Sequence, residues 1–367
     1  MTSKYSQSGV DVNKNETIVK EIKEIVEGGY PTECNQNKIF SFGNFGGLIP
    51  IPQNVIQELY QSQKQNAKER DQLLLVSSMD GVGTKTDFVN KYKGIKGFSG
   101  LGYDLINHCI NDTVVGGGIP LCFLDYIASS KLDTLYVAEF IKGLVSACKE
   151  NSYYLEYQIT LVGGESAEMP DTYQENKYDL VGTMIGYQYQ SQLEKQLLNP
   201  ILKGDIVIGF KSSSPHTNGY SLLRRGIISD KFTKNPKLLE KDKQDFIDWC
   251  CNPHRSYLDV FTKLKKLNVK IKKSIHITGG GWKHNPPRVL PPNLKINFDF
   301  TGYWNDMFDK NYWDIVQEIT ETSIVEMFEV FNCGVGLMMI IDKNEYQKNQ
   351  RLFDNDFCIK KIGVVSN

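Results

Sequence analysis

Residues 73–86 read LLLVSSMDGVGTKT, and the rest of the chain is organised around this stretch. Its first four residues are apolar and predict a buried strand. After the strand come Asp80, Gly81, Gly83 and Lys85. Glycines let backbone N–H groups approach phosphate oxygens, a carboxylate suits Mg²⁺, and lysine supplies positive charge. The stretch therefore predicts a site for a metal-bound polyphosphate; the alternative is a tight glycine turn with a solvated Asp and Lys.

The length and net charge of the chain limit the number of domains and the class of partner that we expect. A chain of 367 residues exceeds one ordinary core, and the polar stretch 188–203 is the best linker, so we expect domains at 1–190 and 200–367. The 42 basic and 43 acidic side chains nearly cancel, which argues against nucleic acid and leaves a small molecule as partner. Residues 1–15 are polar and no apolar run is long enough to span a bilayer, so we expect a cytoplasmic protein without a membrane partner.

A helix predicted at 101–115 carries a polar face. Five side chains share it: Asp104, Asn107, His108, Asn111 and Asp112. Asn and Asp are poor helix formers, so a face made of them is unusual for a merely solvated surface, although that alternative stays open. The functional interpretation is that these carboxylates and amides position a hydrated cation. His108 is then a structural residue, because Mg²⁺ prefers oxygen ligands.

A second strand end also carries glycines and a carboxylate. The run 157–162 predicts a strand that leads directly into Gly163, Gly164 and Glu165. A strand at 120–128 and a helix at 133–148 are predicted before it. The two strand ends therefore resemble one another in residue types.

The second half of the chain contains two further candidate ligand sites. Residues 212–224, SSSPHTNGYSLLR, form a hydroxyl-rich turn before a helix, which predicts an anion site; an ordinary Ser or Thr N-cap is the alternative. Residues 276–282 read HITGGGW. Three successive glycines lose much conformational entropy on folding, so they favour close ligand approach or a strained bend.

Two other features concern assembly and redox state. The segment 40–51, FSFGNFGGLIPI, predicts a strand that is apolar on both faces and needs a partner sheet, so we expect a homodimer. A helix is predicted at 16–27 and a charged surface loop at 61–71. The eight cysteines form no C-x-x-C pair and are expected to be reduced, mostly buried thiols without a catalytic role.

Taken together, the motifs resemble those of the phosphoribosylformylglycinamidine cyclo-ligase family, also called aminoimidazole ribonucleotide synthetases. The matching stretches, in chain order, are 9–12 (GVDV), 45–48 (FGGL), 79–85 (MDGVGTK), 102–105 (GYDL) with 111–112 (ND), 123–126 (FLDY), 163–170 (GGESAEMP), 215–223 (PHTNGYSLL), 278–281 (TGGG) with Asn285 and 287–291 (PRVLP), and 331–336 (FNCGVG). Nine ordered motifs along almost the whole chain are more specific than any one of them.

The resemblance implies a two-domain α/β fold of the α+β type. A mixed or antiparallel N-terminal sheet would pair across a dimer into an intersubunit barrel, and the C-terminal sheet would be flanked by helices. It also implies use of ATP and Mg²⁺ to convert formylglycinamidine ribonucleotide into aminoimidazole ribonucleotide, with release of ADP and phosphate. The N-terminal domain would bind ATP and dimerise, and the C-terminal domain would bind the substrate.

The resemblance also implies roles for individual residues. The expected metal carboxylates are Asp80, Asp112 and Glu165, and the expected catalytic residues are Asp80, Lys85, Asp112 and His216. ATP contacts are expected from Asp11, Lys23, Gly81, Gly83, Thr84, Asp104, Asn111, Gly163 and Gly164. Substrate contacts are expected from Asn218, Thr278, Gly279, Gly280, Gly281 and Asn285.

Two departures affect the glycine loop, since His284 stands where the family usually has Glu and Trp282 replaces the common Phe. Alternatives are another ATP-using member of the superfamily, such as a small-molecule kinase, or a catalytically silent nucleotide-binding subunit. The PHTNGYSLLR and TGGG stretches favour the cyclo-ligase over the former, and the intact carboxylates argue against the latter.

Overall fold

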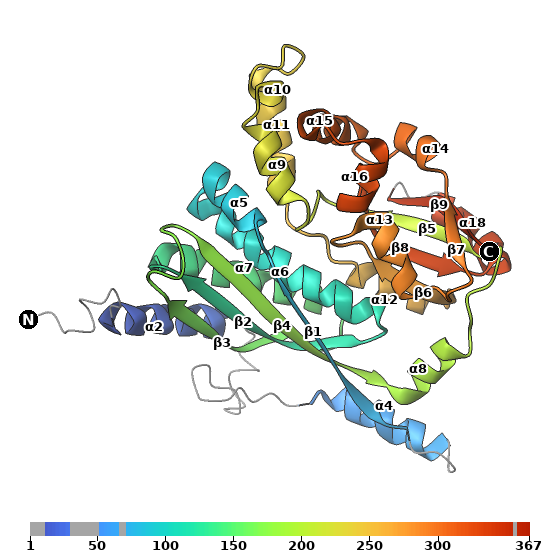
Figure 1. The fold of residues 1–367 in the computed structure, drawn as a ribbon. Coiled ribbons are helices and arrows are strands. Elements are labelled where there is room, and N and C mark those ends of the chain that lie inside the picture. The colour runs from blue at the N-terminus through green and yellow to red at the C-terminus, as the bar shows by residue number, and fades with distance from the viewer. Residues whose placement is uncertain (1–11, 30–50, 66–70, 355–357) are drawn as a thin grey trace, which may run out of the picture. The chain divides into compact units, whose positions relative to one another are not determined.

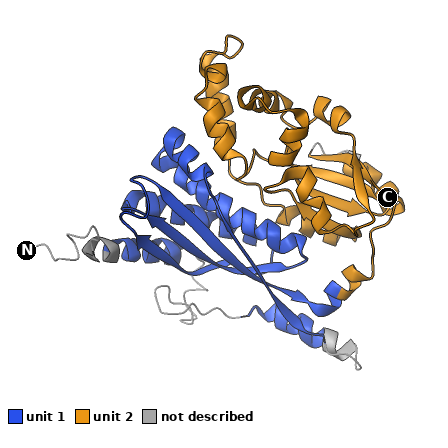
Figure 2. Cartoon of the chain, viewed as in Figure 1, with its two compact units in different colours: residues 1–193 blue, residues 194–367 orange. Residues whose placement is uncertain are grey.

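The computed structural model describes residues 12–29, 51–65, 71–354 and 358–367. The chain divides into two compact units, residues 1–193 and 194–367 (Figure 2). Each unit contains its own sheet. No described helix is long and apolar enough to cross a membrane.

The first unit is built on a mixed sheet of four strands in the order β1-β4-β2-β3. The strands are β1 (Leu73–Gly81), β2 (Ile119–Ser129), β3 (Thr160–Glu168) and β4 (Tyr178–Tyr189). β2 and β3 run parallel, and the other pairs are antiparallel. The helices are α2 (Val12–Gly29), α4 (Gln53–Gln65), α5 (Lys85–Lys93), α6 (Ile95–Val115) and α7 (Thr134–Ser152).

Helices α6 and α7 cover one face of this sheet, and α2 packs on α7 (Figure 1). Apolar side chains of α6, including Leu101, Leu105 and Ile110, are buried in this packing. Close approach of the two helices depends on glycine, because a Cβ at Gly102 would lie 2.5 Å from the backbone nitrogen of Leu144. This packing fixes α6, which carries the polar face, against the strand β1.

Residues in register place Asp80, Gly182, Asp125 and Gly164 in one row across the four strands. Residues directly opposite one another in a sheet point to the same face. This row faces the helices, because Asp80 contacts His108 of α6.

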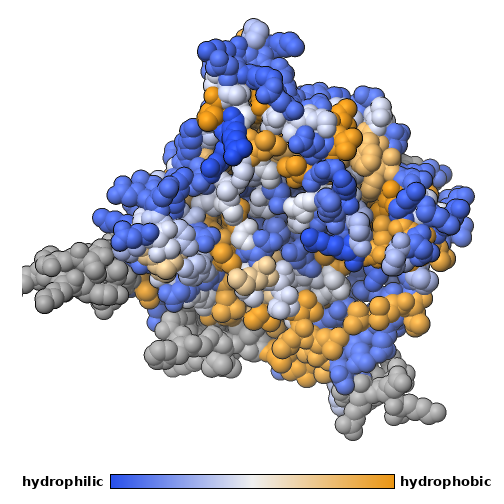
Figure 3. Space-filling model, in the orientation of Figure 1, coloured by the Kyte–Doolittle hydropathy of each residue, from blue (hydrophilic) through white to orange (hydrophobic). Residues whose placement is uncertain are grey.

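The opposite face of the sheet is partly open. α4 packs on it through Val55, against Tyr187 and Tyr189, and the residues of β1 beyond this contact are exposed in the described part of the chain. Leu75 is 80% exposed and Met79 is 70% exposed on the edge strand β1. Figure 3 shows hydrophobic side chains gathered over β1 and β4. Exposed apolar side chains such as Leu75 and Met79, gathered on one part of a sheet face, are typical of an interaction surface.

The second unit contains an antiparallel sheet of five strands in the order β6-β8-β5-β9-β7. The strands are β5 (Ile206–Lys211), β6 (Ile271–His276), β7 (Lys295–Phe298), β8 (Val335–Ile341) and β9 (Ile359–Ser366). Every residue of β8 is buried, so this strand is the centre of the core.

Short helices surround this sheet. They are α9 (Tyr220–Ile227), α10 (Asp230–Thr233), α11 (Glu240–Cys251), α12 (Leu258–Lys266), α13 (Gly281–His284), the 3-10 turn η1 (Pro286–Arg288), α14 (Phe300–Asn305), α15 (Lys310–Thr320), α16 (Ile324–Val330), α17 (Lys343–Lys348) and α18 (Gln350–Asp354). The expected fold class, two α/β domains with a mixed N-terminal sheet and a helix-flanked C-terminal sheet, is confirmed.

Several element boundaries were predicted wrongly. Strand β1 continues to Gly81 and β3 runs through Glu168, so the polar residues expected beyond the strand ends lie within the strands. β1 can continue because each residue through Gly81 has a register partner on β4. Residues 61–65 belong to α4 rather than to a loop, and the predicted linker 188–203 contains the helix α8 (Gln190–Leu197).

Two other expectations concern the cysteines and the strand predicted at 40–51. The seven described cysteines are free, and burial raises the pKa of the Cys122 thiol to about 11, as expected for inert thiols. The strand predicted at 40–51 lies outside the described residues except for its last position.

Candidate active site

The centre of the polar cluster is a contact between β1 and α6. The Asp80 carboxylate pairs with the His108 ring, with 2.8 Å between Oδ2 and Nε2. Asp112, one turn further along α6, lies 3.8 Å from the same nitrogen. Ser78 donates a 3.4 Å hydrogen bond to the Asp112 carboxylate. One imidazole therefore holds two carboxylates from different elements beside one another.

The electrostatics of this cluster favour a charged pair. Burial opposes ionisation of Asp80, but the paired His108 and the Gly81 N–H outweigh it, so the pKa of Asp80 is lowered. Burial disfavours the charged His108 ring, but Asp80 and then Asp112 outweigh it, so the pKa of His108 is raised. The sequence analysis took His108 as a structural residue, and here it pairs with both carboxylates; its i, i+4 spacing to Asp112 was the available signal for that contact.

Lys85 and Asp104 form a second, fully buried pair. The Lys85 ammonium donates to Asp104 Oδ1 over 2.7 Å, and the two side chains are 0% and 1% exposed. Lys85 begins α5 and Asp104 lies on α6, so the pair fastens the first turn of α5 to α6. The alternative of a solvated lysine is therefore wrong. So is the alternative of a solvated helix face, because Asn107, His108 and Asn111 are buried as well.

The glycine turn between β1 and α5 is open to solvent. Gly83 has a φ of 64°, a backbone conformation that L side chains rarely adopt, and a Cβ there would meet nothing within 4 Å. Gly83 and Thr84 are exposed, while Val82 before them and Lys85 after them are buried. The backbone of this turn is thus accessible at the N-terminus of α5, the end of a helix dipole that favours an anion.

The structure does not bring Glu165 to Asp80 and Asp112, which corrects the expected cluster of three carboxylates. Glu165 pairs in register with Tyr126, and Gly164 pairs with Asp125, so Glu165 points to the open face of the sheet. The strand order also puts β1 and β3 at opposite edges. The reason is that β3 continues through Gly163 and Gly164. Successive side chains of a strand point to opposite faces, so Glu165 points away from the face that Gly164 and Asp125 share.

Asp125 is a buried carboxylate that the sequence analysis did not single out. Its Oδ1 lies 2.3 Å from where a Cβ at Gly164 would be, so glycine is needed beside it. That oxygen has no hydrogen-bond partner among the described residues. Burial raises the pKa of Asp125 to about 7. A lone acidic residue in the apolar strand 120–128 was the available signal.

The remaining expected ATP contacts are spread more widely. Asn111 is buried on α6. Lys23 lies on α2 and is exposed, with Glu27 3.8 Å away as its ion-pair partner. Among the described residues, no ion pair joins Lys23 to the Asp80 cluster. Asp11 lies outside the described residues.

In the second unit, His216 sits in a group of three buried histidines. Its ring stacks on His254 at 3.7 Å between centroids, and His254 meets His276 edge-on at 5.1 Å. His216 itself adopts a φ of 61°. The Ser213 N–H donates a 3.4 Å bond to its Nε2, which therefore acts as an acceptor. Sequence reasoning found His216 but not the two histidines packed with it.

The glycine loop is held from within by Asn285. The Asn285 amide donates to the carbonyls of Thr278, Gly279 and Gly281 over 3.3, 3.3 and 2.7 Å. Thr278 donates to the Asn285 side-chain oxygen over 3.3 Å. Asn285 is buried, so it shapes the loop, and its amide donors are already occupied by these carbonyls.

The two polar turns of this unit meet at Asn218. Its side-chain oxygen lies 3.2 Å from where a Cβ at Gly279 would be. Asn218 and Thr278 are partly exposed, and Gly279 is exposed. The helix α9 that follows begins at Tyr220. Its N-cap residue is Gly219, with a φ of 80° and no side-chain cap, so the alternative of an ordinary Ser or Thr cap is wrong.

Asp80 and Asp112 are the residues that fit a bound Mg²⁺. Both offer hard carboxylate oxygens, which this ion prefers. Their side chains are 40% and 33% exposed, so the pair is open to a hydrated ion. The three histidines of the second unit offer nitrogen ligands, which suit Mg²⁺ less well.

Two family models match the chain. The AIR synthase related protein N-terminal domain matches residues 65–188, and the corresponding C-terminal domain matches residues 203–367. The phosphoribosylformylglycinamidine cyclo-ligase of Lawsonia intracellularis is 36% identical over 341 residues, covering 92% of this chain and 86% of that protein. The chain belongs to the phosphoribosylformylglycinamidine cyclo-ligase family. The resemblance seen in the motifs is confirmed.

Other relatives agree with this family. The cyclo-ligase of Prochlorococcus marinus strain NATL1A is 34% identical over 362 residues, covering 98% of this chain and 94% of that protein. Among solved structures, thiamine-monophosphate kinase from Stenotrophomonas maltophilia superposes with a TM-score of 0.54 at 12% identity, covering 82% of this chain and 84% of that chain. At that identity the likeness concerns the fold alone.

As a cyclo-ligase family member the chain is an enzyme, and its two departures in the glycine loop can be placed. Trp282 is buried and donates from Nε1 to the Asn332 carbonyl over 2.8 Å. His284 is exposed at the end of α13. Both substitutions are therefore accommodated without disturbing the hydrogen bonds of Asn285.

Proposed function

We propose that this enzyme uses ATP to close the ring of formylglycinamidine ribonucleotide, giving aminoimidazole ribonucleotide, ADP and phosphate. Family membership supports the reaction. The observation that carries the assignment of the ATP site is the pair of carboxylates, Asp80 and Asp112, held by His108 beside the exposed Gly83 turn. This combination of acidic ligands and an exposed glycine turn at a helix N-terminus suits a metal-bound polyphosphate.

The chemistry explains why ATP is needed. An amide oxygen is a very poor leaving group, so the formyl oxygen first attacks the γ-phosphorus of ATP, and ADP leaves. The amidine-side nitrogen then attacks the activated formyl carbon, and the C–O bond breaks as phosphate departs with that oxygen. Loss of a proton from the ring nitrogen completes the aminoimidazole. Positioning and charge neutralisation carry such a phosphoryl transfer.

The proposed division of labour assigns ATP to the first unit. Asp80 and Asp112 would hold Mg²⁺, which neutralises charge on the transferred phosphoryl group. Gly83 and Thr84 would supply backbone contacts to the polyphosphate. Gly81 would act through Asp80, because its N–H donates to the Asp80 carboxylate. The Lys85–Asp104 pair would hold this turn in place from behind, because it ties α5 to α6.

The second unit is proposed to bind the substrate. Asn218 and the Thr278–Gly281 loop place side-chain and backbone polar groups side by side at a partly exposed surface. His216 is the candidate acid or base for the proton that leaves the ring nitrogen. Asn285 would act indirectly, since its amide fixes the loop.

We also propose that the enzyme works as a cytoplasmic homodimer. The part of the first sheet that α4 leaves exposed, with Leu75 and Met79, supports pairing with a second copy. Glu165 points to this same face. In a face-to-face dimer Glu165 would therefore meet the partner sheet, which would explain why it stands apart from Asp80 within one chain.

An ATPase assay with and without formylglycinamidine ribonucleotide tests the proposed reaction. We expect ADP and phosphate in equal amounts, formed only when the substrate is present, together with aminoimidazole ribonucleotide. Phosphate release that does not depend on this substrate would identify a different ATP-using activity of the superfamily. Absence of ATP turnover with all components present would indicate a silent nucleotide-binding subunit.

A further inference from the structure

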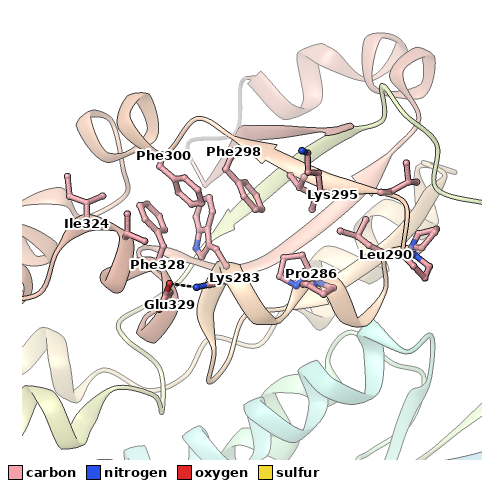
Figure 4. A pocket seen from close by; sticks show the side chains of 16 residues that line it. Lys283, Pro286, Leu290, Lys295, Phe298, Phe300, Ile324, Phe328 and Glu329 are labelled. Atoms are coloured by element: carbon pink, nitrogen blue, oxygen red, sulfur yellow. Dashed lines mark hydrogen bonds and ion pairs between the residues drawn. The ribbon is translucent and has the colours of Figure 1, made fainter. Parts of the chain in front are cut away.

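We propose that a hollow in the second unit binds a flat aromatic molecule that carries one anionic group. The hollow lies between α13, η1, β7, α14 and α16, and Figure 4 shows the side chains that line it. Its volume is about 480 Å³. Small-molecule sites commonly measure roughly 300–1,000 Å³, so the hollow has the size of a ligand pocket.

Aromatic rings make up its inner wall. Trp282 lies 5.0 Å from Phe298 and 4.8 Å from Phe328, and Phe300 lies 4.6 Å from Phe328, measured between ring centroids. The rings are tilted by 49° to 65° at these contacts, and Trp282 and Phe328 are almost fully buried, while Phe300 stays 38% exposed and faces an incoming ligand. A flat ring bound there gains both apolar burial and aromatic contact.

This wall is rigid before any ligand arrives. Trp282 is 1% exposed, and its Nε1–H is fixed on the Asn332 carbonyl over 2.8 Å. Prolines 286, 287, 291 and 292 form much of the opposite rim, and proline has a fixed φ. A preformed, rigid pocket loses little entropy on binding, which favours a small ligand.

The charges at the mouth select an anion. Lys283 and Glu329 pair with one another at 2.6 Å and so cancel. Lys295 also lines the hollow, is exposed, and makes no ion pair within the described part of the chain. One uncompensated ammonium beside an apolar pocket fits a carboxylate, sulfonate or phosphate on the rim of a bound ring.

This pocket is separate from the proposed substrate site. None of the residues that line it is among those assigned to ATP or to the substrate. The amide of Asn285 points to the carbonyls of the glycine loop, while the next residue, Pro286, lines the hollow. The pocket therefore lies on the chain just beyond the glycine loop, and its occupant need not be a substrate.

The test uses two fluorescent probes with the full-length protein. Anilinonaphthalene sulfonate has fused rings and one sulfonate, and N-phenylnaphthylamine has the same rings without the charge. We expect each probe to bind at one site per chain. Binding to the hollow is measured as the part of the fluorescence that is present in the parent and lost in Val325→Arg. Val325 lines the hollow and is 68% exposed, so arginine there should block the pocket without unfolding the unit.

Lys295→Gln separates the charge from the apolar contact. We expect it to weaken the sulfonate probe about tenfold and to leave the neutral probe within about twofold. Leu239→Arg is the matched control, because Leu239 is 71% exposed in the same unit and lies outside the hollow. It should change neither titration.

Three outcomes would overturn the proposal. Unchanged binding of both probes in Val325→Arg would mean that the hollow is not the site. If Lys295→Gln weakened the binding of both probes equally, Lys295 would not recognise the anionic group. Equal losses in Val325→Arg and Leu239→Arg would indicate general surface binding.

Discussion

At the scale of single residues, Asp80 links the stability of the first unit to its chemistry. It is both the partner of buried His108 and the proposed metal ligand. In Asp80→Asn the amide oxygen can still accept from the ring, so we expect the free energy of unfolding to fall by only about 1 kcal/mol. The lost charge should lower ATP turnover by about a hundredfold or more. Chemical denaturation and steady-state ADP formation measure the two effects.

Asp87→Asn is the matched control for this prediction. Asp87 is a carboxylate on α5 that pairs with Lys177 at 3.0 Å and has no proposed role in catalysis. It should keep normal turnover. If Asp80→Asn turned over ATP as fast as Asp87→Asn, Asp80 would not be a metal ligand.

Asp125 predicts a dependence of stability on pH. Burial raises its pKa from the ordinary 3.8 to about 7, so the folded state holds a proton that the unfolded state releases. Its contribution to stability is present below about pH 4 and is lost as the pH rises through 7. Asp125→Asn should therefore stabilise the protein at pH 8, by up to about 4 kcal/mol, and by much less at pH 5.

Thermal unfolding of both proteins from pH 5 to pH 8 checks this sign. The gap between variant and parent must widen as the pH rises. A constant gap would mean that Asp125 is ionised throughout the range.

At the scale of elements, the glycine loop requires glycine both for its backbone conformation and because neighbouring atoms leave no room for a side chain. Gly281 has a φ of 54°, and a Cβ there would lie 2.2 Å from the Phe328 carbonyl oxygen. Gly83 has a similar φ of 64° but open space around it. We expect Gly83→Ala to cost about 1 kcal/mol from backbone strain alone and Gly281→Ala more than about 3 kcal/mol.

Urea unfolding of the two variants separates these contributions. If the two variants lost similar free energies of unfolding, α13 and α16 would be able to move apart to admit a methyl group at Gly281. In that case the tight packing around Gly281 would not be what fixes the loop.

The sequence predicted the main elements of the first unit, but not the faces that its strands present. Hydrophobic runs located β1, β2 and β3, and the polar spacing of α6 identified the residues that meet β1. Strand ends were missed because polar residues such as Asp80 and Glu165 were read as loop, although sheet partners keep them extended. Glu165 was therefore grouped with Asp80 by motif alone. Register decides the face, and register depends on tertiary pairing that no single strand encodes.

At the scale of the whole molecule, the open sheet face predicts a dimer. Leu75→Arg places a charge on that face, where Leu75 is 80% exposed in one chain. We expect the variant to sediment as a monomer while the parent sediments as a dimer. Tyr153→Arg is the control, because Tyr153 is 85% exposed but follows α7 rather than lying on the sheet.

The outcome of this experiment is decided by comparison of the two variants. A dimer that survives Leu75→Arg unchanged would place the interface elsewhere. Dissociation by Tyr153→Arg alone would assign it to the helical side of the unit.

The central claim is that the formyl oxygen leaves on phosphorus, and the fate of that atom tests it most directly. Two carboxylates at an open glycine turn suit phosphoryl transfer, whereas direct dehydration would need a strong acid to expel an amide oxygen. Substrate labelled with ¹⁸O in the formyl group should give inorganic phosphate that carries one label per turnover, measured by mass spectrometry. Label recovered in bulk water, with unlabelled phosphate, would contradict the account.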